Sequence, residues 1–291
     1  MTSLSRADVF LHVLVPAYGD SPYLGETLRS VLATGAADLR LTVVDDGTPG
    51  SAVAEACRAA GPSAEYVPLP AHVGVAGAFQ ACVDRSQGAY TLMMGSDDVM
   101  GPGYPAVLRA LVAEYGEPEL ATSRVNVVDG AGADVRPLPD RVKTVLAPRG
   151  AGSRLLAGDR LVASLLTGNW LYFPALAWRT DVLRAHGFRP DMETVLDLDL
   201  VLRVLLGGGS LAWTPEEAFH YRRHGASVSS RTAVSGERFT EERALYRWAS
   251  ERSGALGWRR SRWAARLRAT SRLHGGLAAV SRLRTRASVG R

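Results

Sequence analysis

The stretch that decides the fold is YTLMMGSDD, residues 90–98. Its apolar part has the length of a strand and does not alternate, which is typical of a strand buried on both faces of a sheet. In an open α/β sheet ligands bind beyond the carboxyl ends of the strands, where Asp97 and Asp98 would lie. Two adjacent carboxylates repel each other, so they favour a cation such as Mg²⁺ or Mn²⁺, with substrate phosphates completing its shell. A solvated Asp-Asp turn is the alternative interpretation.

Strand-like and helix-like segments alternate on both sides of this stretch. The patterns predict strands at 9–15, 39–44, 64–69, 119–128, 210–213 and 219–222, and helices at 24–32, around 53–57, and at 74–85, 104–115, 159–166 and 197–206. Such alternation indicates βαβ units and a parallel sheet, hence an α/β fold. Residues 137–158, rich in Pro, Gly and Arg, are predicted to be a mobile loop. The chain has neither a Gly-x-Gly-x-x-Gly after the first strand nor a Gly-x-x-x-x-Gly-Lys, which removes support for the commonest dinucleotide and P-loop sites.

Length and composition describe an ordinary globular protein of 291 residues, enough for one large α/β domain with an appendage or for two modest domains. Cys57 and Cys82 show no metal-binding spacing and are expected to be buried thiols in a reducing cytoplasm. We find no signal-peptide pattern at the start and no apolar stretch of about 18 residues, so a cytoplasmic protein is expected.

The positive charge gathers at the C-terminus. Residues 237–291 contain fourteen Arg against four Glu, while the whole chain carries a net charge of +5. Trp248, Trp258 and Trp263 recur there at roughly helical spacing. The segment is expected either to pack on the main domain with solvated arginines, or to attach the protein peripherally to an anionic membrane at its inner face. Nucleic acid is not expected, because no binding motif accompanies the charge.

Two further segments are candidates for a site. Residues 168–174, GNWLYFP, form an aromatic cluster that is either a core plug or a platform for a sugar or acceptor. Asp197 and Asp199 open the helix at 197–206 and point about 200° apart around its axis. Asp199 is expected to pair with Arg203 at i+4, whereas Asp197 can face a cleft.

Four stretches occur in the order and spacing of a known family: VLVPAYGDSPYLGETLRSVL, LTVVDDGTPG, HVGVAGAFQACVDRSQGAYTLMMGSDD and DLDLVLRVLLGGGSLAWTPEEAFHYRRHGASVSS. The chain resembles the inverting glycosyltransferases of family 2, in particular the single-domain bacterial enzymes that build surface or secreted glycans. The resemblance implies a GT-A fold, a Rossmann-like and mostly parallel sheet flanked by helices, with a C-terminal helical appendage. The catalytic domain would span 1–235, with a nucleotide-sugar half at about 9–128 and an acceptor half at about 129–235. Residues 236–291 would be a basic helical extension.

The resemblance also implies roles for the residues that bind the donor. In Pro16-Ala17-Tyr18 the tyrosine would stack on the nucleobase, and Asp45 would accept a hydrogen bond from the base. Asp97 and Asp98 would hold a divalent cation, Mn²⁺ or Mg²⁺, and the ribose of a UDP-, dTDP- or GDP-sugar.

The same resemblance places the remaining catalytic roles in the second half of the chain. Asp197 would be the catalytic base, with Asp199 as second choice. The segment Tyr221–His224 would close over the diphosphate through Arg222, and His224 would be a third metal ligand. The acceptor would be a glycan, a lipid-linked sugar or a small molecule.

Three positions depart from the family pattern. Gly95 replaces the first aspartate of the usual Asp-Ser-Asp-Asp, Leu196 replaces a glutamate, and Gln80 replaces an asparagine. Gly95 and Leu196 leave open a catalytically silent protein that binds sugar nucleotides or serves assembly. A nucleotidyltransferase is a weaker alternative, because VPAYGDSPY lacks that class's Gly-rich loop with Arg and Lys.

Overall fold

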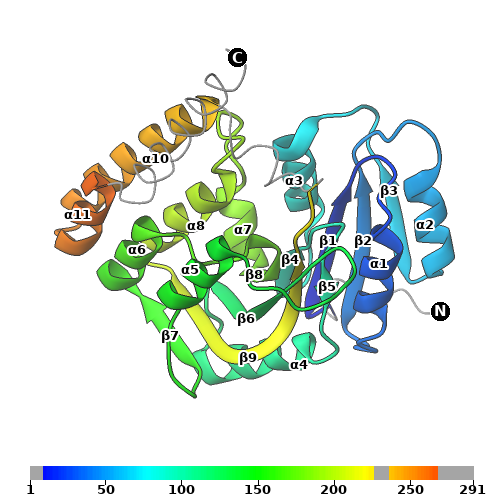
Figure 1. The fold of residues 1–291 in the computed structure, drawn as a ribbon, viewed down its shortest axis with the longest axis horizontal. Coiled ribbons are helices and arrows are strands. Elements are labelled where there is room, and N and C mark those ends of the chain that lie inside the picture. The colour runs from blue at the N-terminus through cyan, green and yellow to red at the C-terminus, as the bar shows by residue number, and fades with distance from the viewer. Residues whose placement is uncertain (1–8, 226–235, 268–291) are drawn as a thin grey trace, which may run out of the picture.

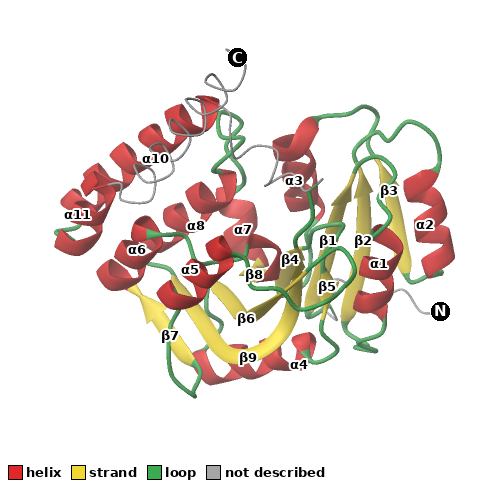
Figure 2. Cartoon of the chain, in the orientation of Figure 1, coloured by secondary structure: helices red, strands yellow, loops and turns green. Residues whose placement is uncertain are grey.

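The computed structural model describes residues 9–225 and 236–267. Within these residues nine strands form one mixed sheet, in the order β3-β2-β1-β4-β8-β6-β9-β5, with β7 paired to β9. Figures 1 and 2 show this sheet as the middle layer of the molecule, running from β3 on the right to β7 on the left. The strands are β1 (Leu11–Ala17), β2 (Leu39–Asp45), β3 (Ala64–Pro68), β4 (Tyr90–Met93), β5 (Val99–Met100), β6 (Leu120–Val128), β7 (Arg154–Ala157), β8 (Leu176–Arg179) and β9 (Ser210–Arg222).

Helices cover both faces of the sheet. They are α1 (Leu24–Leu32), α2 (Ala52–Ala60), α3 (Gly74–Arg85), α4 (Tyr104–Tyr115), α5 (Leu138–Leu146), α6 (Gly158–Thr167), α7 (Thr180–His186), α8 (Leu196–Leu206), α10 (Gly236–Ala255) and α11 (Arg259–Leu267), with a 3-10 turn at Phe173–Ala175. Buried residues of α1, α2 and α4 form one core on the face of the sheet to which Leu11, Val13 and Val15 of β1 point. Buried residues of α3, α6, α7 and α8 form a second core on the opposite face of the sheet. The predicted α/β fold is confirmed.

The parallel part of the sheet places the candidate site. β1 lies between β2 and β4, and all of these pairings are parallel, so their carboxyl ends meet at one edge. All four residues of β4 are buried, as the lack of alternation in its sequence predicted. β1 runs two residues beyond its predicted end, to Ala17, whose carbonyl accepts the N–H of Asp46 at 2.8 Å.

The second half of the chain departs from the sequence prediction in three places. Residues 137–158 are not a loop throughout, because they contain α5 and β7. The two strands predicted at 210–213 and 219–222 are one strand, β9, which curves across the lower edge of the sheet in Figure 1. The register between β9 and β6 shifts on both sides of Arg124. These irregularities accommodate the residues between the two predicted strands, 214–218, within one strand. β8 and α7 lie where no element was predicted.

The C-terminal helices pack on the main domain. Trp248 and Trp258 are partly buried against the core that contains α6 and α8, whereas Trp263 is exposed. The backbone N–H and hydroxyl of Ser261 both donate to Asp159 Oδ1 at 2.7 Å, which joins the start of α11 to α6. The predicted boundary at 235 and the last part of the predicted extension, 268–291, lie outside the described residues. No described helix is long and apolar enough to cross a membrane.

Candidate active site

Two buried aspartates organise the loops after β2 and β3. Asp45 Oδ1 accepts the N–H of Thr48 at 2.9 Å, and its Oδ2 accepts the hydroxyl of Tyr66 at 2.8 Å. Asp46 accepts the N–H groups of Val73 and Gly74 at 2.7 and 3.1 Å, where α3 begins. A carboxylate at a helix N-terminus is stabilised by the unpaired N–H groups and by the helix dipole. The acidic pair therefore fixes the loop that precedes α3 to the edge of the sheet.

An exposed aromatic ring stands beside this loop. Tyr18 follows β1 directly, and its ring stacks on that of His72 with centroids 4.0 Å apart and planes 27° from parallel. His72 Nδ1 lies 2.8 Å from Asp46 Oδ2, so the buried carboxylate fixes the position of the imidazole. Gly47 allows the close approach, because a Cβ on it would lie 2.6 Å from the backbone N of His72. The pair offers a flat surface of the kind on which a nucleobase stacks.

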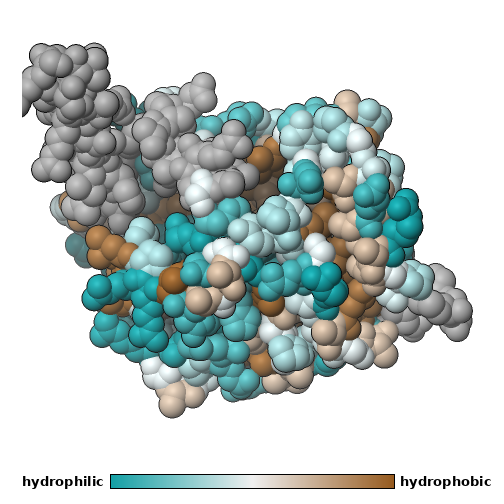
Figure 3. Space-filling model, turned by 45° about the vertical axis from the view of Figure 1, so that its right-hand side comes forward, coloured by the Kyte–Doolittle hydropathy of each residue, from teal (hydrophilic) through white to brown (hydrophobic). Residues whose placement is uncertain are grey.

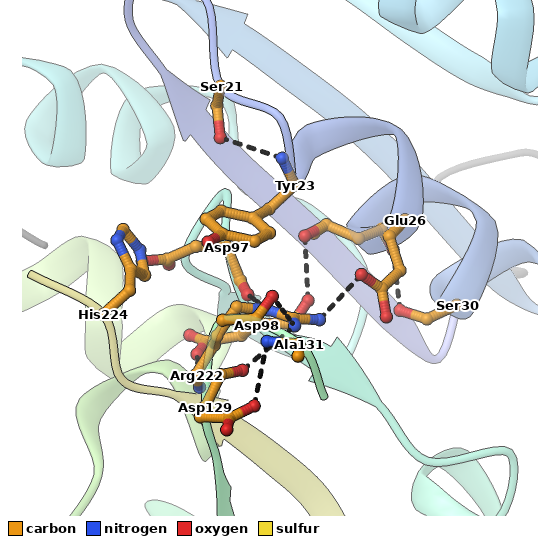
Figure 4. A network of polar contacts seen from close by, with 12 residues as sticks. Ser21, Tyr23, Glu26, Ser30, Asp97, Asp98, Asp129, Ala131, Arg222 and His224 are labelled. Carbon is orange, nitrogen blue, oxygen red and sulfur yellow. Dashed lines mark hydrogen bonds and ion pairs between the residues drawn. The ribbon is translucent and has the colours of Figure 1, made fainter. Parts of the chain in front are cut away.

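The residues after β4 and β9 meet at the same edge of the sheet (Figure 4). His224 Nε2 lies 2.8 Å from Asp97 Oδ2, and both side chains are partly exposed. Asp98 is fully buried, and its Oδ1 accepts the backbone N–H of Arg222 at 2.9 Å. The structure thus brings together the three residues that the sequence suggested for a cation, although among the described residues no group of three His, Cys, Asp or Glu already has ligand geometry.

Asp98 carries a buried oxygen without a hydrogen bond. Its Oδ2 has no partner among the described residues, and burial, followed by the charge of Asp97, raises the pKa of Asp98 well above its usual range. Gly95 lets both carboxylates approach the backbone closely, because a Cβ there would lie 2.6 Å from Asp98 Oδ2 and 2.8 Å from Asp97 Oδ1. Two adjacent carboxylates, one of them with an oxygen that has no hydrogen bond to a described residue, are ligands of the kind that a small divalent cation prefers.

Arg222 is buried under this edge and binds the protein itself. It is 2% exposed, and its Nε donates to the carbonyl of Asp97 at 2.8 Å. One terminal nitrogen donates to the carbonyl of Asp129 at 3.2 Å, and the other lies 2.7 Å from Glu26 of α1. In Figure 4 the guanidinium lies between α1, the residues that follow β4 and the loop at Asp129. This burial does not fit the expected contact between Arg222 and the diphosphate, and it gives Arg222 the task of positioning Asp97.

The two aspartates of α8 are placed differently. Asp199 is fully buried, with Oδ2 2.8 Å from Arg203 Nε and Oδ1 3.4 Å from Arg189. The predicted i, i+4 pair is therefore present, and an acceptor cannot reach this carboxylate. Asp197 is half-buried at the helix start, where its Oδ1 accepts the N–H of Leu198 at 2.7 Å.

A cluster of side chains on α5 lies between the residues that follow β9 and the start of α8. The sequence patterns gave no signal for it. Asp140 is buried, accepts the hydroxyl of Tyr172 at 2.9 Å, and lies 2.8 Å from Arg223 Nε. One turn later Lys143 donates to the carbonyl of Leu171 at 2.6 Å. Burial lowers the pKa of Lys143 to about 8, while the charge of Asp197 acts in the opposite direction. Within the aromatic stretch 168–174, Trp170 and Leu171 are buried as a core plug, and Tyr172 faces this cluster.

The C-terminal helices also reach α8. Glu241 of α10 accepts the backbone N–H groups of Glu193, Thr194 and Val195 through one oxygen, at 3.1, 2.7 and 3.3 Å. These groups precede the first turn of α8, so Glu241 caps the helix that carries Asp197. The signal for this contact is absent from local sequence, because about 47 residues separate the partners.

Solved structures with a similar fold include TarS of S. aureus. The crystal structure of TarS 1–349 matches with a TM-score of 0.60 and 14% identity, covering 82% of this chain and 64% of that one. The same protein in complex with UDP-GlcNAc matches with a TM-score of 0.63 and 16% identity, covering 82% and 66%. The chain thus spans less than two thirds of these TarS chains. At this identity the likeness confirms the expected GT-A fold.

Sequence comparisons carry the assignment further. The chain is 23% identical over 279 residues to an uncharacterized protein of Mycobacterium tuberculosis (strain CDC 1551 / Oshkosh), covering 91% of this chain and 86% of that protein. It is 25% identical over 244 residues to an uncharacterized glycosyltransferase of Nostoc sp. (strain PCC 7120), covering 77% and 69%. Residues 12–154 match the family described as glycosyl transferase family 2, as the sequence motifs predicted, and this match supports a glycosyltransferase.

Proposed function

We propose that the protein transfers a sugar from a nucleoside-diphosphate sugar to an acceptor hydroxyl with inversion at the anomeric carbon. The observation that carries this proposal is the meeting of Asp97, Asp98 and His224 at the carboxyl edge of the parallel strands in a chain that matches family 2. The TarS structure that contains UDP-GlcNAc makes a UDP-sugar the first donor to test, ahead of dTDP- and GDP-sugars. The acceptor we propose is a glycan, a lipid-linked sugar or a small molecule of surface or secreted glycan synthesis.

The donor would lie along the edge from β2 to β4. Tyr18, with Pro16 and Ala17 behind it, would stack on the base, since its ring is exposed and held flat by His72. Asp45 is oriented by hydrogen bonds from the N–H of Thr48 to Oδ1 and from the hydroxyl of Tyr66 to Oδ2. Each carboxylate oxygen keeps a second lone pair, which could accept a hydrogen bond from the base.

The diphosphate would lie over Asp97 and His224. A divalent cation held by Asp97, Asp98 and His224 would stabilise the negative charge that develops on the leaving diphosphate. Arg223 adds positive charge beside His224, and its bond to Asp140 fixes its position. Arg222 would contribute indirectly, because its hydrogen bond to the backbone carbonyl of Asp97 holds that residue in position.

Asp197 would remove the proton from the acceptor. The acceptor oxygen forms a bond to the anomeric carbon, the bond from that carbon to the diphosphate oxygen breaks, and the hydroxyl proton passes to the carboxylate of Asp197. The nearby ammonium of Lys143 favours the ionised form of that carboxylate. Asp199, buried between two arginines, would hold α8 in place.

The test combines a donor panel with two variants of α8. Binding of UDP-, dTDP- and GDP-sugars is measured by calorimetry with Mn²⁺ or Mg²⁺, and transfer or donor hydrolysis is followed with the donor that binds. Asp197→Asn should keep donor binding and lose turnover by orders of magnitude, because only the proton acceptor is removed. Asp199→Asn should mainly lower the free energy of unfolding. Tight donor binding by the unaltered protein without any turnover would instead support the silent sugar-nucleotide-binding protein.

We further propose the division into a catalytic domain, 1–235, and a C-terminal extension, 236–291. The capping of α8 by Glu241 supports a structural task for that extension in the catalytic domain. Peripheral membrane contact through the extension would rest on its arginines and on the exposed Trp263.

A further inference from the structure

Helix α5 turns two charged side chains, Asp140 and Lys143, toward the protein. Asp140 is buried and binds Tyr172 and Arg223, and Lys143 donates to the carbonyl of Leu171. The two residues are three positions apart and so share one face of the helix. A surface helix of a globular protein normally turns its apolar face inward and its charges outward. In α5 the inward face carries Asp140 and Lys143 beside the partly buried Leu146.

The outward face of α5 is apolar. Leu138, Val142 and Val145 are 72%, 47% and 61% exposed. Their spacing of i, i+4 and i+7 puts them in one stripe opposite Asp140 and Lys143. Single exposed apolar residues are common, but a continuous stripe on one helix indicates a contact surface. Figure 3 shows hydrophobic residues, coloured brown, among hydrophilic ones at several places on one face of the molecule.

The exposed charges close to the stripe in sequence are mostly positive. Arg136, Arg141, Arg149 and Arg154 are exposed; of the acidic residues, Asp140 is buried and Asp134, which is exposed, accepts a hydrogen bond from Asn126 at 2.6 Å. An apolar stripe flanked by arginines complements an anionic bilayer, in which acyl chains take the apolar residues and phosphates take the arginines. A second copy of the chain would oppose like charges around the same stripe, which disfavours self-association through this face.

We propose that α5 docks the protein on an anionic lipid surface, with Leu138, Val142 and Val145 in the headgroup region and the neighbouring arginines on lipid phosphates. Because the inner face of α5 holds Arg223 through Asp140, docking would bring the candidate active site next to the bilayer. A lipid-linked acceptor could then reach the site without leaving the membrane. This last step rests on the proposed function, whereas the docking itself does not.

Vesicle sedimentation of the full chain tests the proposal. The protein should sediment with vesicles of phosphatidylcholine and phosphatidylglycerol at low salt, and far less with phosphatidylcholine alone or at high salt, since exposed charges are screened. Replacing the stripe (Leu138→Ser, Val142→Asn and Val145→Asn together) should lower the bound fraction on the order of tenfold. Val75→Asn is the matched control, because this valine of α3 is 42% exposed and lies outside the stripe. Circular dichroism and donor binding should be unchanged in both variants.

Four outcomes would overturn the proposal. The first is that the full chain ignores anionic vesicles at low salt. The second is that the triple variant binds as the unaltered protein does. The third is that binding is lost only when Trp263 and Leu267 of α11 are replaced, which would assign the contact to the C-terminal helices. The fourth is a dimer on size exclusion that the triple variant disperses, which would make a second copy the occupant. Donor binding and turnover are measured separately, so a failed transferase assay leaves the docking result standing.

Discussion

Replacing Arg222 by methionine tests whether this residue positions the donor edge. Methionine keeps most of the apolar stem but removes the donors to the carbonyls of Asp97 and Asp129 at 2.8 and 3.2 Å. Each carbonyl left without a partner at this partly buried position costs about 1–3 kcal/mol. The ion pair with Glu26 adds little, because that carboxylate is half-exposed. We therefore expect Arg222→Met to lower the free energy of unfolding by about 3–5 kcal/mol.

Urea unfolding followed by circular dichroism measures this change. Arg124→Met is the matched control, since Arg124 is exposed and its nitrogen lies 3.9 Å from Glu217, and we expect a change within about 0.5 kcal/mol. Arg222→Met should also weaken metal-dependent UDP binding, because the carbonyl of Asp97 loses its anchor. If the two variants unfold at the same urea concentration with equal slopes, Arg222 does not hold this edge and the reasoning fails.

Three further expectations follow from other parts of the structure. Glu241→Ala should destabilise the protein by about 1–2 kcal/mol and reduce turnover, because the cap of α8 is lost; thermal melting and transfer rates equal to the unaltered protein would refute it. Burial lowers the pKa of His12 to about 4, so as the pH falls the unfolded state takes up a proton on His12 before the folded state does. The free energy of unfolding should therefore fall by about 3 kcal/mol between pH 6.5 and pH 4, and His12→Gln should lack this part of the fall. Equal pH dependence of unfolding for the two proteins would refute the reasoning. Asp98→Asn should abolish metal-dependent donor binding in calorimetry without lowering stability at pH 7, since burial disfavours this charge; a large loss of stability would show that the charge holds the fold together.

Local pattern sufficed for elements with clear boundaries. The helices at Gly74–Arg85 and Tyr104–Tyr115 have the predicted limits, because glycine or proline stands at their starts and a glycine or a change of pattern ends them. The carboxylates after β2 and β4 were expected at the ligand edge from their position alone, and the parallel pairing puts them there. In both cases the deciding information lies within a few residues of the chain.

Other features depend on contacts between distant segments. α5 was predicted to be part of a loop because residues 137–158 are rich in Pro, Gly and Arg, whereas its helix is held by contacts of Asp140 and Lys143 with distant residues. β8 has only four residues, too few for a periodic signal, and is fixed by its neighbours β4 and β6. The bonds from Tyr66 to Asp45 and from Arg223 to Asp140 cross 21 and 83 residues of chain, so no window of sequence contains both partners.

The glycine at position 95 bears on how this chain could evolve. An aspartate there would begin with a Cβ 2.6 Å from Asp98 Oδ2 and 2.8 Å from Asp97 Oδ1. Asp98 is buried and bonded to the backbone of Arg222, so it cannot turn aside at little cost. Substitutions at 95 and 98 would therefore be strongly non-additive. In this chain any side chain at position 95 therefore requires Asp97 or Asp98 to move, which ties the choice of residue at 95 to the conformation of both carboxylates.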